Sequence, residues 1–470
     1  MNTLNVYPLP NGAIEQKDFL IRARALGTKN WKDLSAYQVH VDMHDIREAS
    51  MVYFDFEGEV EIEITFPKFF TVYDVQIRPL SLGITADFEA EKISFILDRP
   101  VNLSVEINKD RFHNLHLFAG AIEEKPAINE NTLVNIIGNN SNEEIIAMPK
   151  GRLIYIEPGI HYISSFIWQI PSDTRVYLAP GAILMGGLEI DHAENIEIFG
   201  RGVIYQWHLP IEYYTNGLTI DHSSQVKVSG ITFINPLHYT ISFGQSTDIQ
   251  VENVKTFSCH GWTDGFDMMS SKNIIINHCF LRTSDDCIAI YGSRWKAKGD
   301  SRNIIVKNTT LWADVAHPMM IGTHGDHEGD GDIIEDVLFE NIDVLEHHEF
   351  QPGYLGVMAL NAGDKNTIKN ITYRNIRIEP FEHGKVFDLR VFWNKRYNPA
   401  PGREIRDIHF EGIYLHTGCG EESATIEGYS PEHLVKNVTI KNYYRDGVKV
   451  TNFDDANITV GQFIENINIE

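Results

Sequence analysis

Aspartates gather in two short runs near the middle of the chain, and their spacing suits acid–base chemistry. The runs are HGWTDGFD (260–267) and TSDDC (283–287). Crowded carboxylates repel each other, which raises the pKa of at least one of them. A protonated carboxyl beside ionised ones can donate a proton while a neighbour activates water, which is how glycosidic bonds are hydrolysed.

The separation of the acids predicts that they meet on one side of a repeating fold. Asp264 and Asp285 are 21 residues apart (285 − 264 = 21), which is close to one short coil of a β-solenoid. Neighbours on a straight strand point to opposite faces, so Asp285 and Asp286 share a cleft only where the chain bends between them. We therefore expect Asp264, Asp285 and Asp286 to cluster at a solenoid corner.

Structural explanations compete with this interpretation. Asp and Asn are common at solenoid turns because their side chains cap backbone groups, and Asp267 fits a support role as well as a direct one. Clustered carboxylates also bind calcium, and the loop DHEGDGD (326–332) is a richer calcium candidate than the Asp264 cluster. It lacks the spacing and ending of an EF-hand, so we interpret it as a solvated loop and expect no metal ion and no other cofactor.

An Asn or Asp followed by an apolar–polar–apolar alternation recurs, with drift, along the second part of the chain. The starts lie 23 to 37 residues apart, at Asn195, Gln225, Asp248, Asn273, Asn303, Asp336, Asn370, Asp407 and Asn437. Short strands with β-branched residues inside favour a β-solenoid over leucine-rich or helical repeats. Parallel stacking would place each inward Ile or Val about 4.8 Å from its neighbour in the next coil. The predicted fold is all-β, with a right-handed parallel β-helix as its main part.

The first part of the chain has a different pattern. Alternating runs such as VEIEI (60–64) predict half-buried antiparallel strands, and no helical period is visible. We predict an N-terminal β-sandwich domain over residues 1–135 and a β-helix catalytic domain over residues 136–470, with a polar linker around 120–144. The sandwich is expected to cover part of the open N-terminal end of the β-helix.

The net charge, the apolar segments and the first residues indicate which partners and which cellular location to expect. Forty Lys and Arg against 65 Asp and Glu give a formal net charge of −25, which repels phosphate backbones and anionic lipid. We expect no nucleic-acid partner and no membrane association, since no window approaches 18 consecutive apolar residues. The start MNTLN lacks the features of a signal peptide, so we expect a cytoplasmic protein, or a secreted one whose leader is absent from this chain.

Cysteine use predicts neither a disulfide framework nor a zinc site. The four cysteines lack the paired spacing of zinc ligands. We interpret them as buried thiols: Cys259, Cys279, Cys287 and Cys419.

TDGFD (263–267) followed by DDC (285–287) resembles the paired motifs of glycoside hydrolase family 28, the polygalacturonases. That family carries NTDG and DDC on consecutive coils of a right-handed β-helix, and GTHG (322–325) resembles its third motif, GHG, with one residue inserted. The resemblance covers roughly residues 150–450 and implies an inverting hydrolase that acts on a polysaccharide or oligosaccharide.

Site roles follow from the resemblance, position by position. It implies that Asp285 is the general acid and that Asp264 and Asp286 activate the water. It also implies that His324 tunes the acid or contacts the sugar. Inversion would then need roughly 6.5–9.5 Å between acid and base, to leave room for water.

The chain departs from the family pattern in two places. Trp262 replaces the Asn before TDG, and the RIK motif that holds the galacturonate carboxylate has no clear counterpart. Its best match is GVMAL (356–360), where Met358 and Leu360 would replace the two cations. A uronic acid would then lose its charge-assisted partner, which favours a neutral sugar such as an α-glucan.

Other residues could restore sugar or carboxylate binding. Arg294 and Lys296 flank Trp295 directly after the Asp-Asp strand, although such charges are more often ordinary solvated loop residues. Further cations lie near Trp393: Arg390, Lys395 and Arg396. Four tryptophans could stack on sugar faces or could equally be packing residues: Trp262, Trp295, Trp312 and Trp393.

A sandwich fused to a β-helix with three such aspartates is also similar to glycoside hydrolase family 49, the dextranases and isopullulanases. That group acts on neutral α-glucans, and LWADVAHP (311–318) resembles a stretch of it that ends in His and Pro near the cleft. The candidate substrate-binding residues are Trp262, Asp267, Arg294, Trp295, Lys296, His317 and His324.

Two other functional classes stay open. A polysaccharide lyase on the same solenoid would abstract a proton beside a uronate carboxylate, and Arg282, Arg294 and Lys296 could serve it. It would depend on a metal ion and release a product that absorbs in the ultraviolet. A non-catalytic carbohydrate-binding or structural solenoid has no need of stacked aspartates, and its expected trimerising elements are not visible in the sequence.

Overall fold

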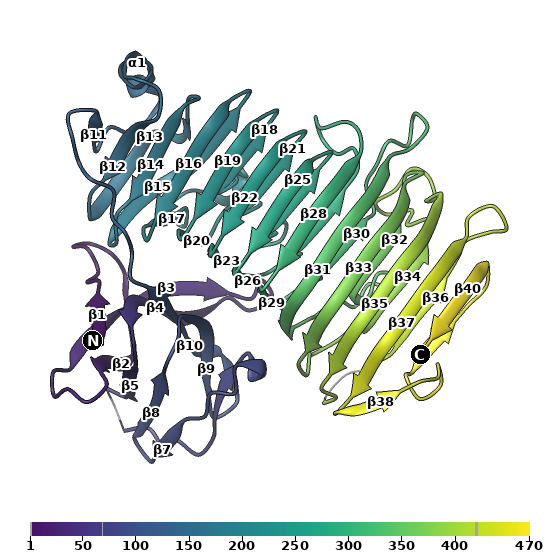
Figure 1. Ribbon diagram of the computed structural model, residues 1–470, viewed down its shortest axis with the longest axis horizontal. Coiled ribbons are helices and arrows are strands. Elements are labelled where there is room, and N and C mark those ends of the chain that lie inside the picture. The colour runs from purple at the N-terminus through teal and green to yellow at the C-terminus, as the bar shows by residue number, and fades with distance from the viewer. Residues whose placement is uncertain (1, 68, 419–421) are drawn as a thin grey trace.

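The computed structural model describes residues 2–67, 69–418 and 422–470. Within them the strands form two sheets, one of ten strands between Thr3 and Ala121 and one of thirty strands between Thr132 and Ile469. The second sheet winds into a long β-helix, and the first lies beside its N-terminal half (Figure 1). The predicted architecture, a right-handed parallel β-helix preceded by an N-terminal β-sandwich, is confirmed.

The N-terminal sheet folds on itself. Its elements are β1 (Thr3–Val6), β2 (Glu15–Ala25), β3 (Lys32–Val41), β4 (Arg47–Glu57), β5 (Val60–Thr65), β6 (Val75–Arg78), η1 (Leu80–Leu82), β7 (Asp87–Glu89), β8 (Lys92–Leu97), β9 (Val101–Ile107) and β10 (Asp110–Ala121). The strand order is β6-β9-β10-β4-β3-β2-β5-β8-β7, with β1 on β4. Strands far apart in this order share one core, which includes Ile62 of β5 and Leu103 of β9. Period-two alternation thus produces a sandwich.

Each coil of the β-helix contributes strands to three parallel columns, called columns 1, 2 and 3. Column 1 contains β11 (Thr132–Val134), β12 (Arg152–Ile156), β14 (Thr174–Leu178), β16 (Glu194–Gly200), β19 (Ser224–Ser229), β22 (Thr247–Glu252), β25 (Lys272–Asn277), β28 (Ser301–Lys307), β31 (Ile333–Glu346), β33 (Thr367–Ile378), β35 (Glu404–Leu415), β37 (Val435–Arg445) and β40 (Ile464–Ile469). Column 2 contains β13 (Gly159–Gln169), β15 (Ala182–Asp191), β17 (Val203–Tyr205), β20 (Thr232–Ile234), β23 (Lys255–Phe257), β26 (Phe280–Thr283) and β29 (Thr310–Ala313).

Column 3 carries the outer face that matters for function. It contains β18 (Leu218–Asp221), β21 (Ile241–Gly244), β24 (Phe266–Met269), β27 (Ile288–Tyr291), β30 (Met319–Gly322), β32 (Gly356–Ala362), β34 (Lys385–Val391), β36 (Ala424–Glu427) and β39 (Ile458–Val460). The remaining elements are η2 (Asn139–Ser141), α1 (Asn142–Ala147), η3 (Ile211–Tyr213) and β38 (Val448–Val450), which pairs antiparallel with β37.

The repeated Asn or Asp of the sequence marks a turn at the start of column 1. All nine predicted starts have a left-handed backbone, with φ between 53° and 60°. Asn and Asp tolerate this region better than other non-glycine residues, which explains their recurrence. Their side chains also bond from coil to coil, as in Asn273 to Asp248 (2.9 Å) and Asn303 to Asn273 (3.1 Å).

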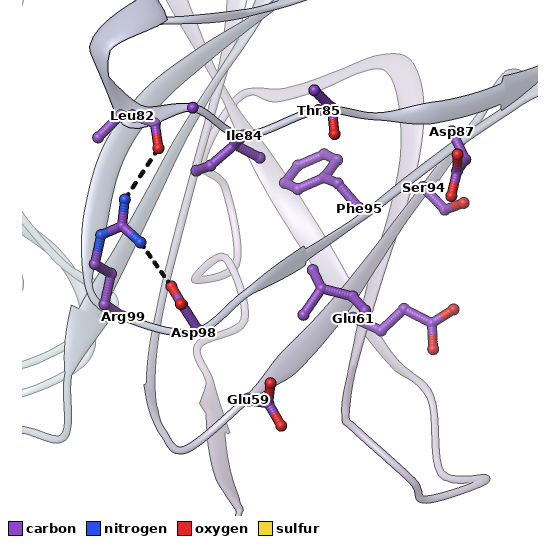
Figure 2. A pocket seen from close by; sticks show the side chains of 12 residues that line it. Glu59, Glu61, Leu82, Ile84, Thr85, Asp87, Ser94, Phe95, Asp98 and Arg99 are labelled. Atoms are coloured by element: carbon purple, nitrogen blue, oxygen red, sulfur yellow. Dashed lines mark hydrogen bonds and ion pairs between the residues drawn. The ribbon is translucent and has the colours of Figure 1, made fainter.

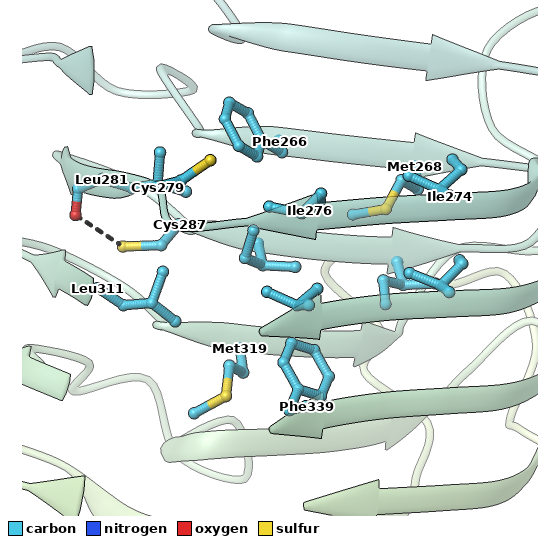
Figure 3. Packing of buried hydrophobic residues seen from close by; sticks show 14 of the residues in the cluster. Phe266, Met268, Ile274, Ile276, Cys279, Leu281, Cys287, Leu311, Met319 and Phe339 are labelled. Carbon is cyan, nitrogen blue, oxygen red and sulfur yellow. Dashed lines mark hydrogen bonds between the residues drawn. The ribbon is translucent and has the colours of Figure 1, made fainter. Parts of the chain in front are cut away.

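Apolar side chains stack in rows inside the β-helix. Ile249, Ile274 and Ile304 follow one another in register in column 1, and Phe266 and Ile288 do so in column 3. Figure 3 shows this packing in the middle coils. Each such side chain stabilises the fold by about 1.5–3 kcal/mol relative to exposure. The stack is the rigid support for the outward residues of column 3.

The N-terminal sheet packs against the side of the β-helix, along column 2. Tyr37, Val39 and Met51 share a buried cluster with Phe257 and Trp312. The N-terminal end of the β-helix is covered instead by α1, which places Ile145 in the β-helix core. The expectation that the sandwich covers this end was wrong, because the outward residues of column 2 are apolar and need the sheet as their cover.

Two further sequence predictions concern the cysteine thiols and membrane-spanning segments. Cys259, Cys279 and Cys287 are free and buried, as predicted, while Cys419 lies outside the described residues. No helix in the described chain combines the length and the apolar character that a membrane crossing requires.

Candidate active site

The acidic cluster lies at the turns that join column 2 to column 3. Asp264 lies between β23 and β24, and Asp285 and Asp286 lie between β26 and β27. Phe266 is in register with Ile288, so the coil here is 22 residues long (288 − 266 = 22). The chain bends at the predicted corner, and Asp264 matches Asp286 in register while Asp285 precedes it on the turn.

Buried hydroxyl groups explain why the chain turns at these aspartates. The Thr283 hydroxyl donates to the carbonyl of Asp285 (2.7 Å), which closes the turn. Across neighbouring coils, the Ser284 N–H donates to Ser258 Oγ (3.1 Å) and the Ser284 hydroxyl donates to the Ser258 carbonyl (3.0 Å). Local side-chain bonds of this kind compete with continuation of a strand.

The three carboxylates are closer together than the predicted inverting distance. Asp264, Asp285 and Asp286 each place an oxygen within 4.8 Å of the others. These oxygens are closer together than the roughly 6.5–9.5 Å that inversion would need between the acid and the base. A water that donates two bonds of roughly 2.8 Å joins acceptors about 4.5 Å apart, so one water fits between two of them. The same spacing could hold a metal ion.

Asp285 is the partly exposed member of the cluster. Its Oδ2 accepts the Trp262 N–H (2.8 Å), and its Oδ1 accepts the Asp286 N–H (3.1 Å). Removal from water and the neighbouring Asp286 raise the pKa of Asp285 to about 7, against the opposing effect of the two N–H groups and His317. A carboxyl group that is half protonated near neutral pH is suited to donate a proton.

Asp286 is held by His317. The His317 backbone N–H (3.1 Å) and Nδ1 (2.6 Å) both approach Asp286 Oδ1, while His317 Nε2 faces the Tyr354 carbonyl (2.7 Å). Both ring nitrogens face acceptors, so both carry a proton. Asp286 and Glu349 raise the pKa of His317 to about 9 although burial opposes this. His317 is fully buried, so it is a support for Asp286, and the expected sugar contact by its side chain is wrong.

Asp264 and Asp267 form the buried part of the cluster. Asp267 is 0% exposed, and neither of its oxygens accepts a hydrogen bond from an N–H or a hydroxyl group of the described residues. Burial raises the pKa of both carboxyls well above its ordinary value, and neighbouring acids add to this while Arg294 opposes it. The Asp267 and Asp264 side chains share a hydrogen bond, which opposes the rise in the pKa of Asp267. Since Asp267 is buried, it supports Asp264 and does not itself reach a sugar.

Arg294 is the cation beside the acids. Its guanidinium lies over the rings of Tyr239 (5.8 Å), Tyr291 (4.6 Å) and Trp295 (5.3 Å). It makes no ion pair with a described carboxylate, and Asp267 and Asp264 act on its pKa only through space. An arginine held by aromatic faces without a carboxylate partner is suited to bind an incoming anion.

A cavity of about 240 Å³ adjoins Arg294 on the N-terminal side of the acids. Asn216 and His238 bond each other (3.1 Å), and Asn216 also donates to Ser242 (2.9 Å). Lys296 and Asp221 line the same space. At about 30 Å³ per water molecule the cavity holds roughly eight waters, a volume of the order of one sugar ring. Sequence patterns do not predict Tyr214, Asp221 or His238 at this cavity, because their positions depend on the register of two other coils.

Three exposed aromatic residues around the cluster have a left-handed backbone. The φ angles are 44° at Tyr214, 60° at Trp262 and 52° at Trp295, and the side chains are 50%, 60% and 67% exposed. Bulky residues rarely adopt this conformation, and such strain often occurs at functional sites. The rings of Tyr214 and Trp262 lie 6.1 Å apart. Exposed rings in these positions are suited to stack on a sugar.

His324 lies next to the same group of rings. Its imidazole packs edge-on against Tyr291 (5.2 Å), and its backbone carbonyl accepts the Gly292 N–H (3.2 Å). Burial and Arg294 lower the pKa of His324 to about 3. The ring is therefore neutral at physiological pH and can offer a hydrogen bond but no charge.

Met358 and Leu360 do not occupy a sugar subsite. Both side chains lie in the β-helix core, and the outward positions of β32 are Ala359 and Asn361. The predicted alignment was wrong by one residue, which reverses the face of every side chain in a strand. The neutral character of the position is unchanged, since Ala359 and Asn361 carry no charge.

Trp312 and Arg282 are structural, and Trp393 is half-buried. Trp312 is buried against Arg282 (4.1 Å) and donates to Asp314 (2.9 Å). Trp393 donates its indole N–H to the Asn398 carbonyl (3.0 Å). Arg282 is fully buried in an ion pair with Asp314, so it is unavailable as the base of a lyase.

A larger cavity lies elsewhere, in the N-terminal sheet. It measures about 430 Å³ and is lined by residues that include Glu61, Asp87 and Phe95 (Figure 2). Its Arg99 is already bonded to Asp98 (2.9 Å) and to the Leu82 carbonyl (3.0 Å). Nothing in this cavity resembles the arrangement of acids at the β-helix turns.

Known proteins resemble this chain in sequence and in fold. The sequence profile described as "Glycosyl hydrolases family 28" matches residues 212–460, which is more than half of the chain and includes all the acids. The chain belongs to this glycoside hydrolase family.

Relatives by sequence carry polygalacturonase names. The chain is 28% identical over 283 residues to "Probable exopolygalacturonase B" of Aspergillus fumigatus, which covers 53% of this chain and 59% of that one. It is 27% identical over 227 residues to "Exopolygalacturonase B" of Aspergillus niger, covering 45% and 49%. The family 28 chain thus spans about half the length of these relatives.

Solved structures share the fold at low sequence identity. Dex49A from Penicillium minioluteum aligns with a TM-score of 0.63 at 15% identity, over 99% of this chain and 94% of that one. The family 28 exopolygalacturonase of Yersinia enterocolitica aligns with a TM-score of 0.50 at 13% identity, over 87% and 96%. At such identities the likeness describes the fold of this family 28 chain alone.

Proposed function

We propose that this protein is an inverting, polygalacturonase-like hydrolase in which Asp285 is the general acid and Asp264 and Asp286 activate the attacking water. The observation that carries the proposal is the group of three carboxylates within 4.8 Å at one corner of the β-helix. A carbohydrate-binding or structural role does not require three carboxylates at one place, because like charges that lie close together repel each other.

Asp285 is suited to be the acid because its surroundings differ from those of Asp286. The pKa of Asp285 is raised to about 7, so it retains a proton near neutral pH. Asp286 forms an ion pair with His317 (2.6 Å). Two neighbouring carboxyls with different environments provide the proton donor and the base that glycoside hydrolysis requires.

The water is best placed between Asp264 and Asp286. Their turns pair directly, with the Gly265 N–H donating to the Asp286 carbonyl (2.8 Å). Two carboxylates that share one water can hold it and accept its proton as it attacks the anomeric carbon. Asp285 then protonates the leaving oxygen, so the sugar ends with one new C–O bond to water and one broken C–O bond to the leaving group.

The distances between the carboxylates do not by themselves favour inversion of the anomeric configuration. Retaining enzymes have carboxyl groups roughly 5–5.5 Å apart and use one as a nucleophile, which is closer to the spacing here. Inversion is supported by the third carboxylate, since two bases around one water favour direct attack by that water. Proton NMR of the first product tests this: an anomer opposite to that of the substrate is expected, and the same anomer would contradict inversion.

We propose that the substrate is an acidic polysaccharide whose carboxylate is bound by Arg294, with Lys296, beside the 240 Å³ cavity. The support is the absence of an ion-pair partner for Arg294 among the described residues, and the polygalacturonase names of the sequence relatives. Trp262, Trp295 and His324 would contact the sugar from the rim. A neutral α-glucan is the second candidate, favoured by Ala359 and Asn361 at the outward positions of β32.

The test combines two substrates and one variant. Wild-type protein and Asp285→Asn are assayed for reducing ends released from polygalacturonate and from dextran, with ultraviolet absorbance followed in parallel. We expect hydrolysis of polygalacturonate without absorbance, and a loss of activity on the order of 10²–10⁴-fold in Asp285→Asn.

Each other outcome has a defined meaning. Activity on dextran alone would establish the neutral substrate and refute the role of Arg294. A product that absorbs in the ultraviolet would indicate a lyase. Full activity in a folded Asp285→Asn would refute the catalytic assignment, and circular dichroism on the same preparation establishes that the variant is folded.

A further inference from the structure

A buried ion pair joins the two turns that carry the catalytic groups. Arg282 Nε and Nη2 donate to the two carboxylate oxygens of Asp314 (2.8 and 2.9 Å), and the side chains are 0% and 1% exposed. The geometry is bidentate, which fixes orientation as well as distance. Trp312 lies under the guanidinium (4.1 Å) and donates to Asp314 (2.9 Å).

The N-terminal sheet provides the other partners of this arginine. Arg282 Nη1 donates to Asn114 Oδ1 (2.9 Å) and approaches His116 Nε2 (3.3 Å), and Nη2 donates to the Arg111 carbonyl (3.0 Å). All three partners belong to β10. His116 Nδ1 in turn faces the Ser50 carbonyl of β4 (3.1 Å). Nδ1 therefore carries the ring proton, and Nε2 accepts a hydrogen bond from the arginine.

The ion pair is connected to the acids by short segments of backbone. Arg282 directly precedes the turn of Asp285 and Asp286, and Asp314 directly precedes the turn of His317. The Asp314 N–H donates to the Thr283 carbonyl (2.8 Å), and the Cys287 N–H donates to the His317 carbonyl (2.8 Å). The two turns are thus tied at both ends, with the Asp286–His317 contact between them.

We propose that Arg282 and Asp314 are positioning residues for catalysis, and that the N-terminal sheet holds them through Asn114 so that the turns of Asp285–Asp286 and His317 keep their spacing. The inference rests on the proposed function, since it assumes that these acids are catalytic. It gives the N-terminal sheet a part in the reaction beyond covering column 2.

A second ion pair between the two parts of the molecule supplies a matched control. Arg201 Nε donates to Asp55 Oδ1 (3.2 Å), and Asp55 is 2% exposed by its side chain. Tyr7 donates to the other oxygen of Asp55 (2.9 Å). This pair also joins the N-terminal sheet to the β-helix, but it is remote in sequence from the turns of the catalytic groups.

The experiment compares Asp314→Asn with Asp55→Asn in the full chain, on whichever of polygalacturonate and dextran the wild type hydrolyses. Both changes remove one charge from a buried pair and should lower Tm. A displacement of about 1 Å at the catalytic groups can cost on the order of 10²-fold in rate, so we expect kcat of Asp314→Asn to fall about 10–100-fold with KM nearly unchanged. In Asp55→Asn, kcat should stay within about twofold.

The pH profile separates positioning from simple loss of folded protein. Displacement of His317 and Asp286 alters both charges that act on Asp285, so the alkaline limb of the kcat profile should move in Asp314→Asn. A smaller folded fraction would scale the profile without moving it. An Asp314→Asn variant with the wild-type limb and the kcat of Asp55→Asn would overturn the proposal.

If Asp314→Asn does not fold, Asn114→Ala gives the answer, because it keeps the ion pair and removes only the amide from the N-terminal sheet. A severalfold fall in kcat is expected, and unchanged kcat would overturn the proposal. Asp285→Asn is measured beside these variants. If it stays active, the proposed function is wrong; if it is inactive while Asp314→Asn is normal, only the positioning role is wrong.

Discussion

Two buried aspartates, Asp267 and Asp388, occupy equivalent outward positions on column 3 but differ in their hydrogen-bond partners. Asp267 of β24 is connected by register through Ala289, Met320 and Ala359 to Asp388 of β34. Both are 0% exposed. Asp388 accepts hydrogen bonds from Arg390 (2.8 Å) and from the Leu355 N–H (3.1 Å). Asp267 has no such partner among the described residues.

The difference separates a structural acid from a functional one. Asp388 is compensated by an arginine that also pairs with Glu427 (3.2 Å), so its burial needs no further explanation. Among the described residues, Asp267 bonds to another acid, Asp264, and is not paired with a cation, so its burial costs stability that the fold does not recover locally. An uncompensated polar cluster of this kind is expected where binding or catalysis supplies the missing partner.

The largest expected effect comes from exchanging each aspartate for asparagine. In Asp267→Asn the new amide can donate to Asp264 and compete with the water for that carboxylate, so kcat should fall on the order of 10²-fold. Stability should rise by about 1 kcal/mol, since a buried unpaired acid is removed. In Asp388→Asn, kcat should stay within about twofold, while the free energy of unfolding falls by about 1–3 kcal/mol.

Kinetics and urea denaturation of the two variants check this contrast, with the wild type as reference. The comparison fails if the two substitutions change stability in the same direction. It fails equally if Asp388→Asn loses as much activity as Asp267→Asn.

The second effect is a loss of activity with rising pH. Asp285 must be protonated to act as the acid, and its pKa is raised to about 7. The rate should therefore fall about tenfold for each pH unit above 7. A pH profile of kcat checks this, and an alkaline limb that Asp285→Glu leaves unmoved would assign the ionisation to another group.

Stability should fall over a related pH range. The folded-state pKa of Asp285 lies above its ordinary value of 3.8, and that of His317 lies above 6.5, at about 9. Groups with raised pKa values stabilise the fold fully below the unfolded value and lose that contribution as pH rises through the folded value. Stability should therefore decline from about pH 4 to 7 through Asp285, and from about pH 6.5 to 9 through His317. Thermal unfolding in buffers across this range measures the decline.

Much of the fold was predictable because it depends on local patterns. The recurring Asn and Asp mark left-handed turns, and the alternation of residues such as Ile274 and Ile276 fixes the inward face. The acids were located from motif and spacing alone. The 21-residue separation was one residue short of the coil, and this changed which acid lies beside Asp264.

The remainder depends on contacts that no local pattern encodes. Met358 and Leu360 were placed one residue out of register, which exchanged core for surface. The role of His317 depends on Tyr354, a residue from the next coil. The packing of the N-terminal sheet against column 2 depends on the tertiary fit of two separate sheets. These relations are non-local, so spacing along the chain carries little information about them.

The arginines near these two aspartates, Arg390 and Arg294, provide a second comparison with a smaller expected effect. Arg390 is paired with Asp388 and Glu427, whereas Arg294 lies over aromatic rings and forms no ion pair with the carboxylates that the structure describes. Arg294→Gln should raise KM for polygalacturonate about tenfold, because a charge-assisted bond is worth about 1.5–3 kcal/mol. Arg390→Gln should leave KM unchanged and lower stability. Equal KM for wild type and Arg294→Gln would remove Arg294 from substrate binding.

The smallest expected effect concerns a cation as the missing partner of the acids. Asp264, Asp285 and Asp286 are spaced to hold a metal ion, and calcium prefers carboxylate oxygens. Such an ion would neutralise these acids as Arg390 neutralises Asp388, and the two regions would no longer differ.

Two cations near the acids disfavour a bound metal ion. The imidazolium of His317 is already paired with Asp286 (2.6 Å), and Arg294 lies nearby. Both repel a further positive charge at this place. We therefore expect less than about twofold change in activity when a chelator is added or when calcium is restored. A large loss with chelator that calcium reverses would show that the acids require an ion, and that Asp285 is not free to donate a proton.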